Sequence, residues 1–271
     1  MEKRKYSTVL TIAGSDSGGG AGIQADLKTF SACGCYGMSV ITAITAQNTK
    51  RVSDIWPAPL SSIEKQLEAV LEDMGADAVK VGMLHSSEII NLVAGKIKKY
   101  KITNLVVDPV MVAASGEKLL RDEASDTLKR ELLPLARVIT PNLPEASILS
   151  GREVASQSQM HAAARELSCN QSVSVMLKSG HLGSPCPADV FYHAETDEMH
   201  VFESPHLKTN NTHGTGCTLA SAMASFLAKG YGLLDAVSMG KEYIHNAILH
   251  GSNYQIGHGH GPVHHFFNWW E

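Results

Sequence analysis

The chain has 271 residues, of which 44% are hydrophobic, and a formal net charge of -4 at pH 7. This composition gives no basic excess for nucleic acid or an anionic membrane, so we expect neither partner. No apolar run approaches the roughly 20 residues that span a bilayer. The first residues lack a signal-peptide pattern, so we expect a cytoplasmic protein.

Short β-branched segments alternate with amphipathic segments along the chain. Strands are predicted at 8–12, 40–45, 78–81, 105–107, 138–139 and 173–177, with an antiparallel pair at 190–192 and 200–202. Amphipathic segments, which predict helices, lie at 23–32, 60–74, 89–97, 119–133, 145–149 and 157–167, and two more helices start near 218 and 234. This alternation predicts an α/β fold with a mostly parallel sheet covered on both faces, an antiparallel edge, and a single domain over residues 1–271.

The five cysteines are an odd number, and no two of them have C-x-x-C spacing. This pattern argues against a disulfide framework and against a zinc site. We therefore expect reduced thiols.

Reactive, amide and glycine residues follow the predicted strands. They include Gly14, Gln47, Gly82, Asp108, Asn142, Glu145 and Lys178. The carboxyl ends of the strands in an open α/β sheet form the ligand crevice, so these residues should converge. Each also has an ordinary explanation, such as a turn at Asp108, a helix cap at Glu145 or a solvated charge at Lys178. Six such loops at one edge are harder to explain by turns alone.

The segment 210–218 is a glycine-rich turn that leads directly into an apolar helix. Its glycines allow a tight turn with uncovered N–H groups, and the start of a helix adds donors with partial positive charge. Such a place binds an anion. The helix start should also lower the pKa of the Cys217 thiol. The alternative is an ordinary loop-to-helix junction with a buried cysteine.

Asp108, Glu145 and Lys178, together with this turn, supply what phosphoryl transfer requires. They offer oxygen ligands for Mg²⁺, a cation and preorganised backbone donors, which favours a nucleoside triphosphate. The P-loop pattern is absent. Residues 20–25 imitate a dinucleotide fingerprint, but no acidic residue follows about 20 residues later, so we discount a dehydrogenase.

Motifs spread along nearly the whole chain resemble the hydroxymethylpyrimidine/phosphomethylpyrimidine kinases of thiamine biosynthesis, members of the ribokinase superfamily. The motifs lie at 13–26, 45–49, 80–83, 108–111, 140–145 and 211–217, with a similar tail at 257–265. The resemblance implies a ribokinase-like three-layer α/β/α sandwich. It also implies ATP-dependent phosphorylation of 4-amino-5-hydroxymethyl-2-methylpyrimidine and then of its monophosphate, with Mg²⁺. We further expect a homodimer.

The resemblance also implies roles for individual residues. Gln47 would recognise the aminopyrimidine, because a carboxamide offers a donor beside an acceptor. The same pocket would be lined by Gly14, Asp26, Met83 and Val110. Asn142 and Glu145 match an N-x-x-E motif at the magnesium ion and phosphates, with Glu145 and Asp108 as metal ligands. The nucleotide or its metal would contact Asp108, Lys178, Thr215 and Lys241.

Cys217 stands where most of the superfamily has an aspartate base. We expect it, with a lowered pKa, to accept the substrate hydroxyl proton, while amides from Gly214 to Gly216 hold the moving phosphoryl group. Replacement of Cys217 by alanine should then lower kcat by roughly 10²–10⁴-fold.

Three alternatives are weighed against this function. A pyridoxal or pyridoxine kinase of the same superfamily also binds a flat ring with a hydroxymethyl arm, although Cys217 and Gln47 favour the pyrimidine. A non-catalytic vitamer-binding protein would be expected to lack Asp108, Glu145 or the glycine turn. A redox enzyme would need a resolving cysteine near Cys217 in the sequence, and none is present.

Overall fold

The computed structural model describes residues 4–112, 119–121, 123–180 and 188–270. Within these residues, one nine-stranded sheet has the order β3-β2-β1-β4-β5-β6-β7-β8-β9. The strands are β1 (Thr8–Asp16), β2 (Tyr36–Gln47), β3 (Val52–Pro57), β4 (Ala78–Val81), β5 (Leu105–Val107), β6 (Val138–Ile139), β7 (Ser174–Leu177), β8 (Ala188–His193) and β9 (Glu198–Glu203). The six central neighbours β2, β1, β4, β5, β6 and β7 pair in parallel. The edge strand β3 pairs antiparallel with β2, and at the other edge β8 pairs antiparallel with β7 and β9.

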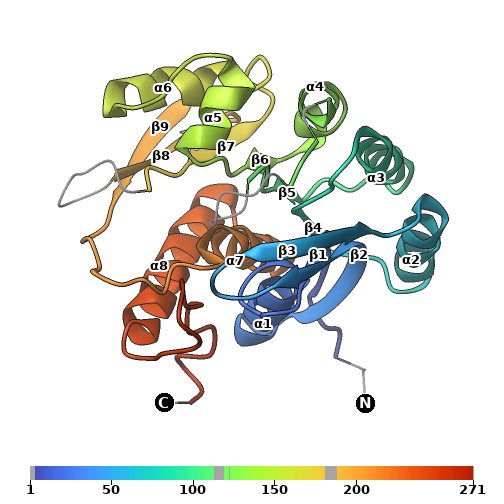
Figure 1. Cartoon of the computed structure of the whole chain (residues 1–271). Helices are drawn as coiled ribbons and strands as arrows, with labels where there is room; N and C mark the ends of the chain where they lie inside the picture. The colour runs from blue at the N-terminus through green and yellow to red at the C-terminus, as the bar shows by residue number, and fades with distance from the viewer. Residues whose placement is uncertain (1–3, 113–118, 122, 181–187, 271) are drawn as a thin grey trace.

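Helices cover both faces of the sheet (Figure 1). They are α1 (Gly22–Ala32), α2 (Leu60–Asp73), α3 (Ser87–Lys99), α4 (Ala124–Thr127), α5 (Leu143–Ser150), α6 (Gln157–Glu166), α7 (Thr215–Ala228) and α8 (Leu233–Gly251). In the part of the chain that the structure describes, none of the helices has the length and apolar character that a membrane crossing requires.

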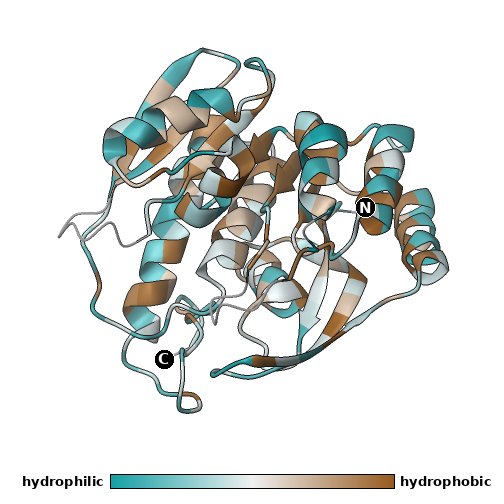
Figure 2. Cartoon of the chain, turned by 45° about the horizontal axis from the view of Figure 1, so that its top comes forward, coloured by the Kyte–Doolittle hydropathy of each residue, from teal (hydrophilic) through white to brown (hydrophobic). Residues whose placement is uncertain are grey.

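Alternate residues of the strands feed two hydrophobic cores. In β5, Leu105 and Val107 pack with α2, α3, α5 and α6, whereas Val106 packs with α1, α7 and α8. This follows from the two-residue period of a strand, which sends neighbouring side chains to opposite faces. Figure 2 shows hydrophobic residues along the strands between the helix layers. The predicted mostly parallel sheet with an antiparallel edge is therefore confirmed.

Two parts of the predicted element order were wrong. The edge strand β3 was not predicted, because its residues Ser53, Asp54 and Trp56 are exposed and give no apolar run. In the described part of the amphipathic segment 119–133, a short helix, α4, is followed by the π-helical turn η1 (Leu128–Leu132) and the 3₁₀ turn η2 (Leu133–Leu135) in place of one continuous α-helix. Pro134 in η2 cannot donate a backbone hydrogen bond, so a regular helix does not continue there.

Candidate active site

The start of α7 is shaped by Gly214, which precedes the helix with a left-handed φ of 81°. A Cβ atom on Gly214 would lie 1.8 Å from the carbonyl oxygen of Gly20, so only glycine fits. The close contact joins the turn before α7 to the glycine-rich turn before α1. The first N–H groups of α7 lack partners within the helix and bear partial positive charge, as an anion site requires.

A cavity of about 430 Å³ opens in front of this turn. Every residue predicted for the site lines it, except Asp26 and Lys241. Gly14 and Gln47 come from the ends of β1 and β2, and Met83, Asp108, Asn142 and Lys178 follow β4, β5, β6 and β7. The predicted convergence of the carboxyl ends of the strands is thus present.

A second cavity of about 380 Å³ lies on the other side of the start of α7. It is lined by Lys241 and Ile244 of α8 and by Asp189 of β8. Lys241 Nζ lies 2.7 Å from Asp189 Oδ2, so this lysine belongs to the second cavity and not to the first. The two cavities share four lining residues: Lys178, Thr212, Thr215 and Gly216.

Lys178 and Asp108 form an ion pair where the cavities meet. Lys178 Nζ lies 2.9 Å from Asp108 Oδ1, which also accepts a hydrogen bond from Thr140 Oγ1 at 2.8 Å. Although burial opposes it, the positive charges of Lys178 and Lys80 hold the pKa of Asp108 below its usual range. A Cβ atom on Gly216 would lie 3.1 Å from Lys178 Nζ, so this glycine lets α7 approach the pair closely.

Glu145 and Asn142 form a capping box at the start of α5. Asn142 Oδ1 accepts from the Glu145 amide at 2.9 Å, and Glu145 Oε2 accepts from the Asn142 amide at 2.8 Å. Burial, with a contribution from the negative charge of Asp108, raises the pKa of Glu145 to about 7. The N-x-x-E motif therefore has a structural function in the fold as well as a place in the cavity wall.

The two carboxylates fit a magnesium ion that would take its other ligands from phosphate and water. The hydrogen bonds of Asp108 to Thr140 and Lys178 both go to Oδ1, and Asp108 Oδ2 is the oxygen nearer to Gly216. Mg²⁺ is often held by one or two carboxylates plus substrate phosphates. No cluster of three or more His, Cys, Asp or Glu side chains that could hold a metal occurs among the described residues.

Asp26 does not line the cavity, so the prediction that it contacts the substrate was wrong. Its carboxylate is fully buried and accepts from Lys80 Nζ at 2.9 Å through both oxygens. Thr11 Oγ1 and Ser221 Oγ donate to the same carboxylate, at 2.6 and 2.7 Å. These four bonds occupy the oxygen atoms that a substrate would need.

The predicted low pKa of Cys217 was also wrong. Desolvation by the surrounding protein raises the pKa of this thiol to about 11, and the lowering effect of Lys80 is smaller. The prediction considered the charge at the helix start and omitted the cost of placing a thiolate away from water. Cys217 nevertheless lies in the cavity wall beside Gly216.

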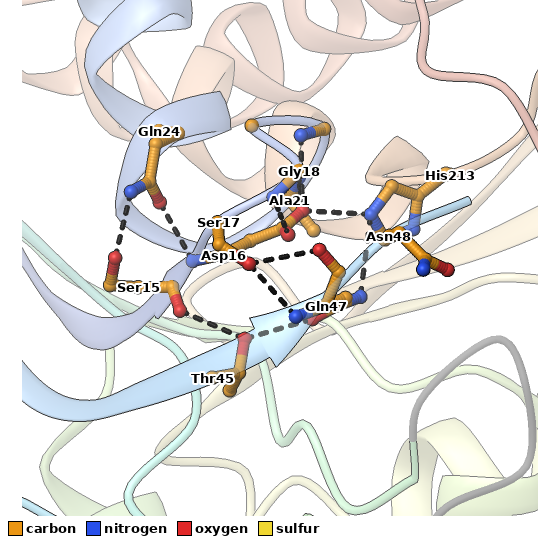
Figure 3. Close-up of polar contacts among 12 residues, drawn as sticks. Ser15, Asp16, Ser17, Gly18, Ala21, Gln24, Thr45, Gln47, Asn48 and His213 are labelled. Atoms are coloured by element: carbon orange, nitrogen blue, oxygen red, sulfur yellow. Dashed lines mark hydrogen bonds and ion pairs between the residues drawn. The ribbon is translucent and has the colours of Figure 1, made fainter. Parts of the chain in front are cut away.

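Gln47 belongs to a network that links the ends of β1 and β2 to the turn before α7 (Figure 3). Asp16 accepts from the amides of Gly18, Gly20 and Ala21 at 2.8 to 3.0 Å. His213 Nε2 lies 2.8 Å from Asp16 Oδ2 and 3.4 Å from Gln47 Nε2. The network thus ties the predicted recognition residue to the predicted reactive turn.

Asp16 and Lys80 line the cavity but were not predicted to act there. Both residues have a recognisable pattern in the sequence. Asp16 precedes a run of glycines whose amides need an acceptor. Lys80 lies in the centre of the buried strand β4, where a charge requires a partner.

The chain is similar over nearly its whole length to proteins of known name. The model of the family described as phosphomethylpyrimidine kinase matches residues 16–264. A hydroxymethylpyrimidine/phosphomethylpyrimidine kinase of Rhizobium meliloti is 48% identical over 263 residues, which cover 97% of this chain and 98% of the relative. These likenesses confirm the resemblance that the motifs indicated.

Solved structures agree on the fold. A phosphomethylpyrimidine kinase from Clostridium difficile has a TM-score of 0.78 and 46% identity, over 89% of this chain and 99% of that chain. An ADP complex of Bacillus subtilis pyridoxal kinase has a TM-score of 0.88 and 38% identity, over 96% of this chain and 98% of that chain. The predicted ribokinase-like fold is confirmed. Motifs, cavity and likenesses agree that the chain belongs to the phosphomethylpyrimidine kinase family of phosphotransferases.

Proposed function

We propose that this chain transfers the γ-phosphoryl group of ATP to the hydroxymethyl oxygen of 4-amino-5-hydroxymethyl-2-methylpyrimidine, and then to the resulting monophosphate, with Mg²⁺ as cofactor. The observation that carries the proposal is the pair of cavities that meet at the start of α7. Phosphoryl transfer needs an acceptor and a donor on opposite sides of one anion site. The amides of Gly214, Thr215 and Gly216 supply that site.

The acceptor occupies the first cavity in this proposal. Gln47 recognises the aminopyrimidine edge, and Met83 and Val110 provide apolar surfaces for the ring. Gly14 lets the ring approach the backbone, because it has no side chain, and a Cβ atom there would lie 3.1 Å from Met83 Sδ. The hydroxymethyl arm then points to Gly216 and Cys217.

The nucleotide occupies the second cavity, with its phosphates directed to the shared wall. Lys241, held by Asp189, and Lys178 neutralise phosphate charge, and Thr215 donates from the first turn of α7. Asp108 and Glu145 hold the magnesium ion, with Asn142 fixing Glu145 through the capping box. The ion supplies charge neutralisation at the phosphates. The bound ADP of the Bacillus subtilis relative supports a nucleotide site in this fold.

In this proposal the thiolate form of Cys217 accepts the hydroxyl proton and becomes the neutral thiol. A thiol with a pKa of about 11 is seldom ionised at neutral pH, yet it is closer in pKa to an alcohol than an aspartate is. A base with so high a pKa suits a loose transition state, in which the hydroxyl proton is lost late.

A pyridoxal kinase is the second candidate, since the TM-score to the Bacillus subtilis enzyme, 0.88, exceeds the 0.78 to the Clostridium difficile one. Sequence identity favours the pyrimidine kinase, at 46% against 38%.

We also propose that the chain forms a homodimer in the cytoplasm. Light scattering tests the oligomeric state, and cell fractionation tests the location.

An ADP-release assay decides between the two substrates. The purified chain is supplied with ATP and with the pyrimidine alcohol, its monophosphate or pyridoxine, each with and without Mg²⁺. We expect kcat/KM for the pyrimidine alcohol to exceed that for pyridoxine by about 10²-fold or more. The proposed reason is that the Gln47 carboxamide pairs with the aminopyrimidine edge, which pyridoxine does not have. A preference for pyridoxine would refute the proposal.

The placement of the nucleotide has its own test. Lys241→Met should raise the KM for ATP about tenfold and leave the KM for the pyrimidine unchanged, since a charge-assisted bond to phosphate is lost. Lys229→Met is the control, because Lys229 caps the opposite end of α7 and donates to Cys33 O. An equal rise in both KM values would contradict the assignment of the second cavity.

A further inference from the structure

The chain after α8 joins two turns that carry walls of the first cavity. Residues 257–263, which we call the C-terminal strap, belong to the red chain that follows α8 in Figure 1. One part of the strap contacts the turn between β2 and β3, and another part contacts the turn before α7. The strap itself lines neither cavity, so it does not act by touching a ligand there.

Thr49 is the contact point at the turn between β2 and β3. The amide of His260 donates to Thr49 O at 2.8 Å, and the amide of Gly259 donates to Thr49 Oγ1 at 3.2 Å. A Cβ atom on Gly259 would lie 2.1 Å from Thr49 O, so a larger residue would push the two backbones apart. Thr49 lies two residues after Gln47, in a tight turn closed by the side chain of Asn48. The strap therefore holds the end of β2 that carries Gln47.

His213 is the contact point before α7. Its amide donates to Gly261 O at 3.0 Å, and His213 pairs with Pro262 in an isolated parallel bridge. A Cβ atom on Gly261 would lie 2.0 Å from Asn211 Oδ1, so the strap approaches this turn as closely as glycine permits. His213 directly precedes Gly214, whose left-handed φ shapes the start of α7. The strap therefore also holds the turn whose amides form the proposed anion site.

Both flanks of the strap are attached to the rest of the fold. Before it, the carbonyl oxygens of Gly251 and Tyr254 accept from Asn211 Nδ2 at 2.6 and 2.7 Å. After it, the amide of His264 donates to Ala247 O of α8 at 2.9 Å. A segment fixed on both flanks does not follow the movements of the turns that it contacts. It can therefore hold those turns at a set separation.

We infer that the C-terminal strap is a positioning segment for the acceptor, because it sets the separation between Gln47 and the turn from Gly214 to Cys217. The acceptor ring lies at Gln47 in the proposed function, and its hydroxymethyl arm must reach the amides at the start of α7. A misplacement of about 1 Å can cost about 10²-fold in rate. This inference rests on the proposed function, since it requires the acceptor in the first cavity.

The first test displaces the strap from Thr49. Gly259→Ala places a Cβ atom against the Thr49 carbonyl oxygen. We expect it to lower kcat/KM for the pyrimidine alcohol about tenfold or more, through both constants, and to leave the KM for ATP within about twofold of the wild-type value. His258→Ala is the matched control, because it removes an exposed side chain from the same strap. It should leave all of these constants unchanged.

A second pair of variants changes the other side of the same contact. Thr49→Val removes the hydroxyl that accepts from the amide of Gly259, and Thr49→Ser keeps it. Thr49→Val should raise the KM for the pyrimidine alcohol about threefold, as expected for one lost hydrogen bond. Thr49→Ser should restore the wild-type value. If Gly259→Ala does not fold, this pair decides alone, and an unchanged KM in Thr49→Val overturns the inference.

Calorimetry gives a measurement that does not depend on turnover. In Gly259→Ala, the dissociation constant of the pyrimidine alcohol without nucleotide should rise about tenfold, and that of ADP should stay constant. A purely structural strap would lower the stability of Gly259→Ala to urea and leave both dissociation constants unchanged. That result would overturn the inference while the kinase function stands, and so would an equal rise for both ligands. If the wild-type chain neither binds nor phosphorylates the pyrimidine alcohol, the proposed function fails and the inference fails with it.

Discussion

Lys80 and Asp26 form an ion pair in which neither side chain is exposed, with Lys80 Nζ 2.9 Å from both carboxylate oxygens. The pair joins β4 to α1, and Ser221 attaches α7 to the same carboxylate. Ser221 lies one helical turn after Cys217, so the pair anchors the helix whose first turn is the proposed anion site. Lys80 also lines the cavity, and therefore places a fixed positive charge in its wall.

Removing one partner of this ion pair should destabilise the fold. We expect Lys80→Met to lower the free energy of unfolding by about 3–5 kcal/mol, because Asp26 is left as an unpaired buried charge. The double variant Asp26→Asn with Lys80→Met should recover most of that loss, since the amide oxygen accepts from one of the hydroxyls of Thr11 and Ser221 and the amide nitrogen donates to the other. Lys98→Met, in a half-exposed pair with Glu131, is the control with a change below about 1 kcal/mol. Urea unfolding measures all three. Equal stability of the single and double variants would contradict this explanation.

The raised pKa of Cys217 gives the reaction a distinctive pH dependence. A base must be deprotonated to act, and the thiol has a pKa of about 11. Between pH 8 and 9.5, kcat should therefore rise, by up to about tenfold per pH unit. Cys217→Ala should lower kcat by roughly 10²-fold and abolish the rise. A flat profile in the wild-type chain, or an unchanged slope in Cys217→Ala, would exclude the thiol as the base.

Glu145 should make stability fall as the pH rises through the acidic range. Its pKa is raised from 4.5 in the unfolded chain to about 7 in the fold. Between these values the folded state binds more protons than the unfolded state, so the free energy of unfolding decreases with pH. The difference between the wild-type chain and Glu145→Gln should change from about pH 4.5 to 7 and stay constant above. Urea unfolding at several pH values measures it, and a difference that does not vary would contradict the raised pKa.

Gly214 should be replaceable by no other residue without loss of activity. In Gly214→Ala the new Cβ atom would meet the Gly20 carbonyl at 1.8 Å, in addition to the strain of a left-handed φ. We expect kcat/KM to fall by about 10²-fold or more, because the donors move from the phosphoryl position.

Gly230→Ala is the matched control. Gly230 has a φ of 86° and open space around its Cβ position. It should cost about 1 kcal/mol of stability, the usual left-handed penalty, and leave activity intact. Full activity in Gly214→Ala would show that the interlocking of the two glycine turns is unnecessary for catalysis.

The convergence of the site residues could be predicted from the sequence, because a parallel sheet brings the carboxyl ends of its strands together whatever side chains they carry. Asp108, Asn142 and Lys178 were therefore correctly placed at the cavity. The prediction for Asp26 failed because it rested on the resemblance alone. A charged residue on the buried face of α1, together with a lysine inside the buried strand β4, indicates a pair in the interior.

Other features depended on balances that sequence patterns do not carry. The pKa of Cys217 is set by desolvation against the charge of Lys80, and both depend on packing in three dimensions. The network of Asp16 and His213 joins residues 197 positions apart, so no local pattern reveals it. The edge strand β3 pairs with β2 through backbone hydrogen bonds, which a mostly polar sequence does not announce.

The wall formed by Lys178, Thr212, Thr215 and Gly216 separates the two cavities and belongs to both. If the two cavities hold acceptor and nucleotide as proposed, a substitution in this partition alters the surroundings of both, whereas Gln47 and Lys241 each line one cavity. New acceptor preferences on this scaffold should therefore arise in the part of the first cavity away from the partition, with the partition itself left unaltered.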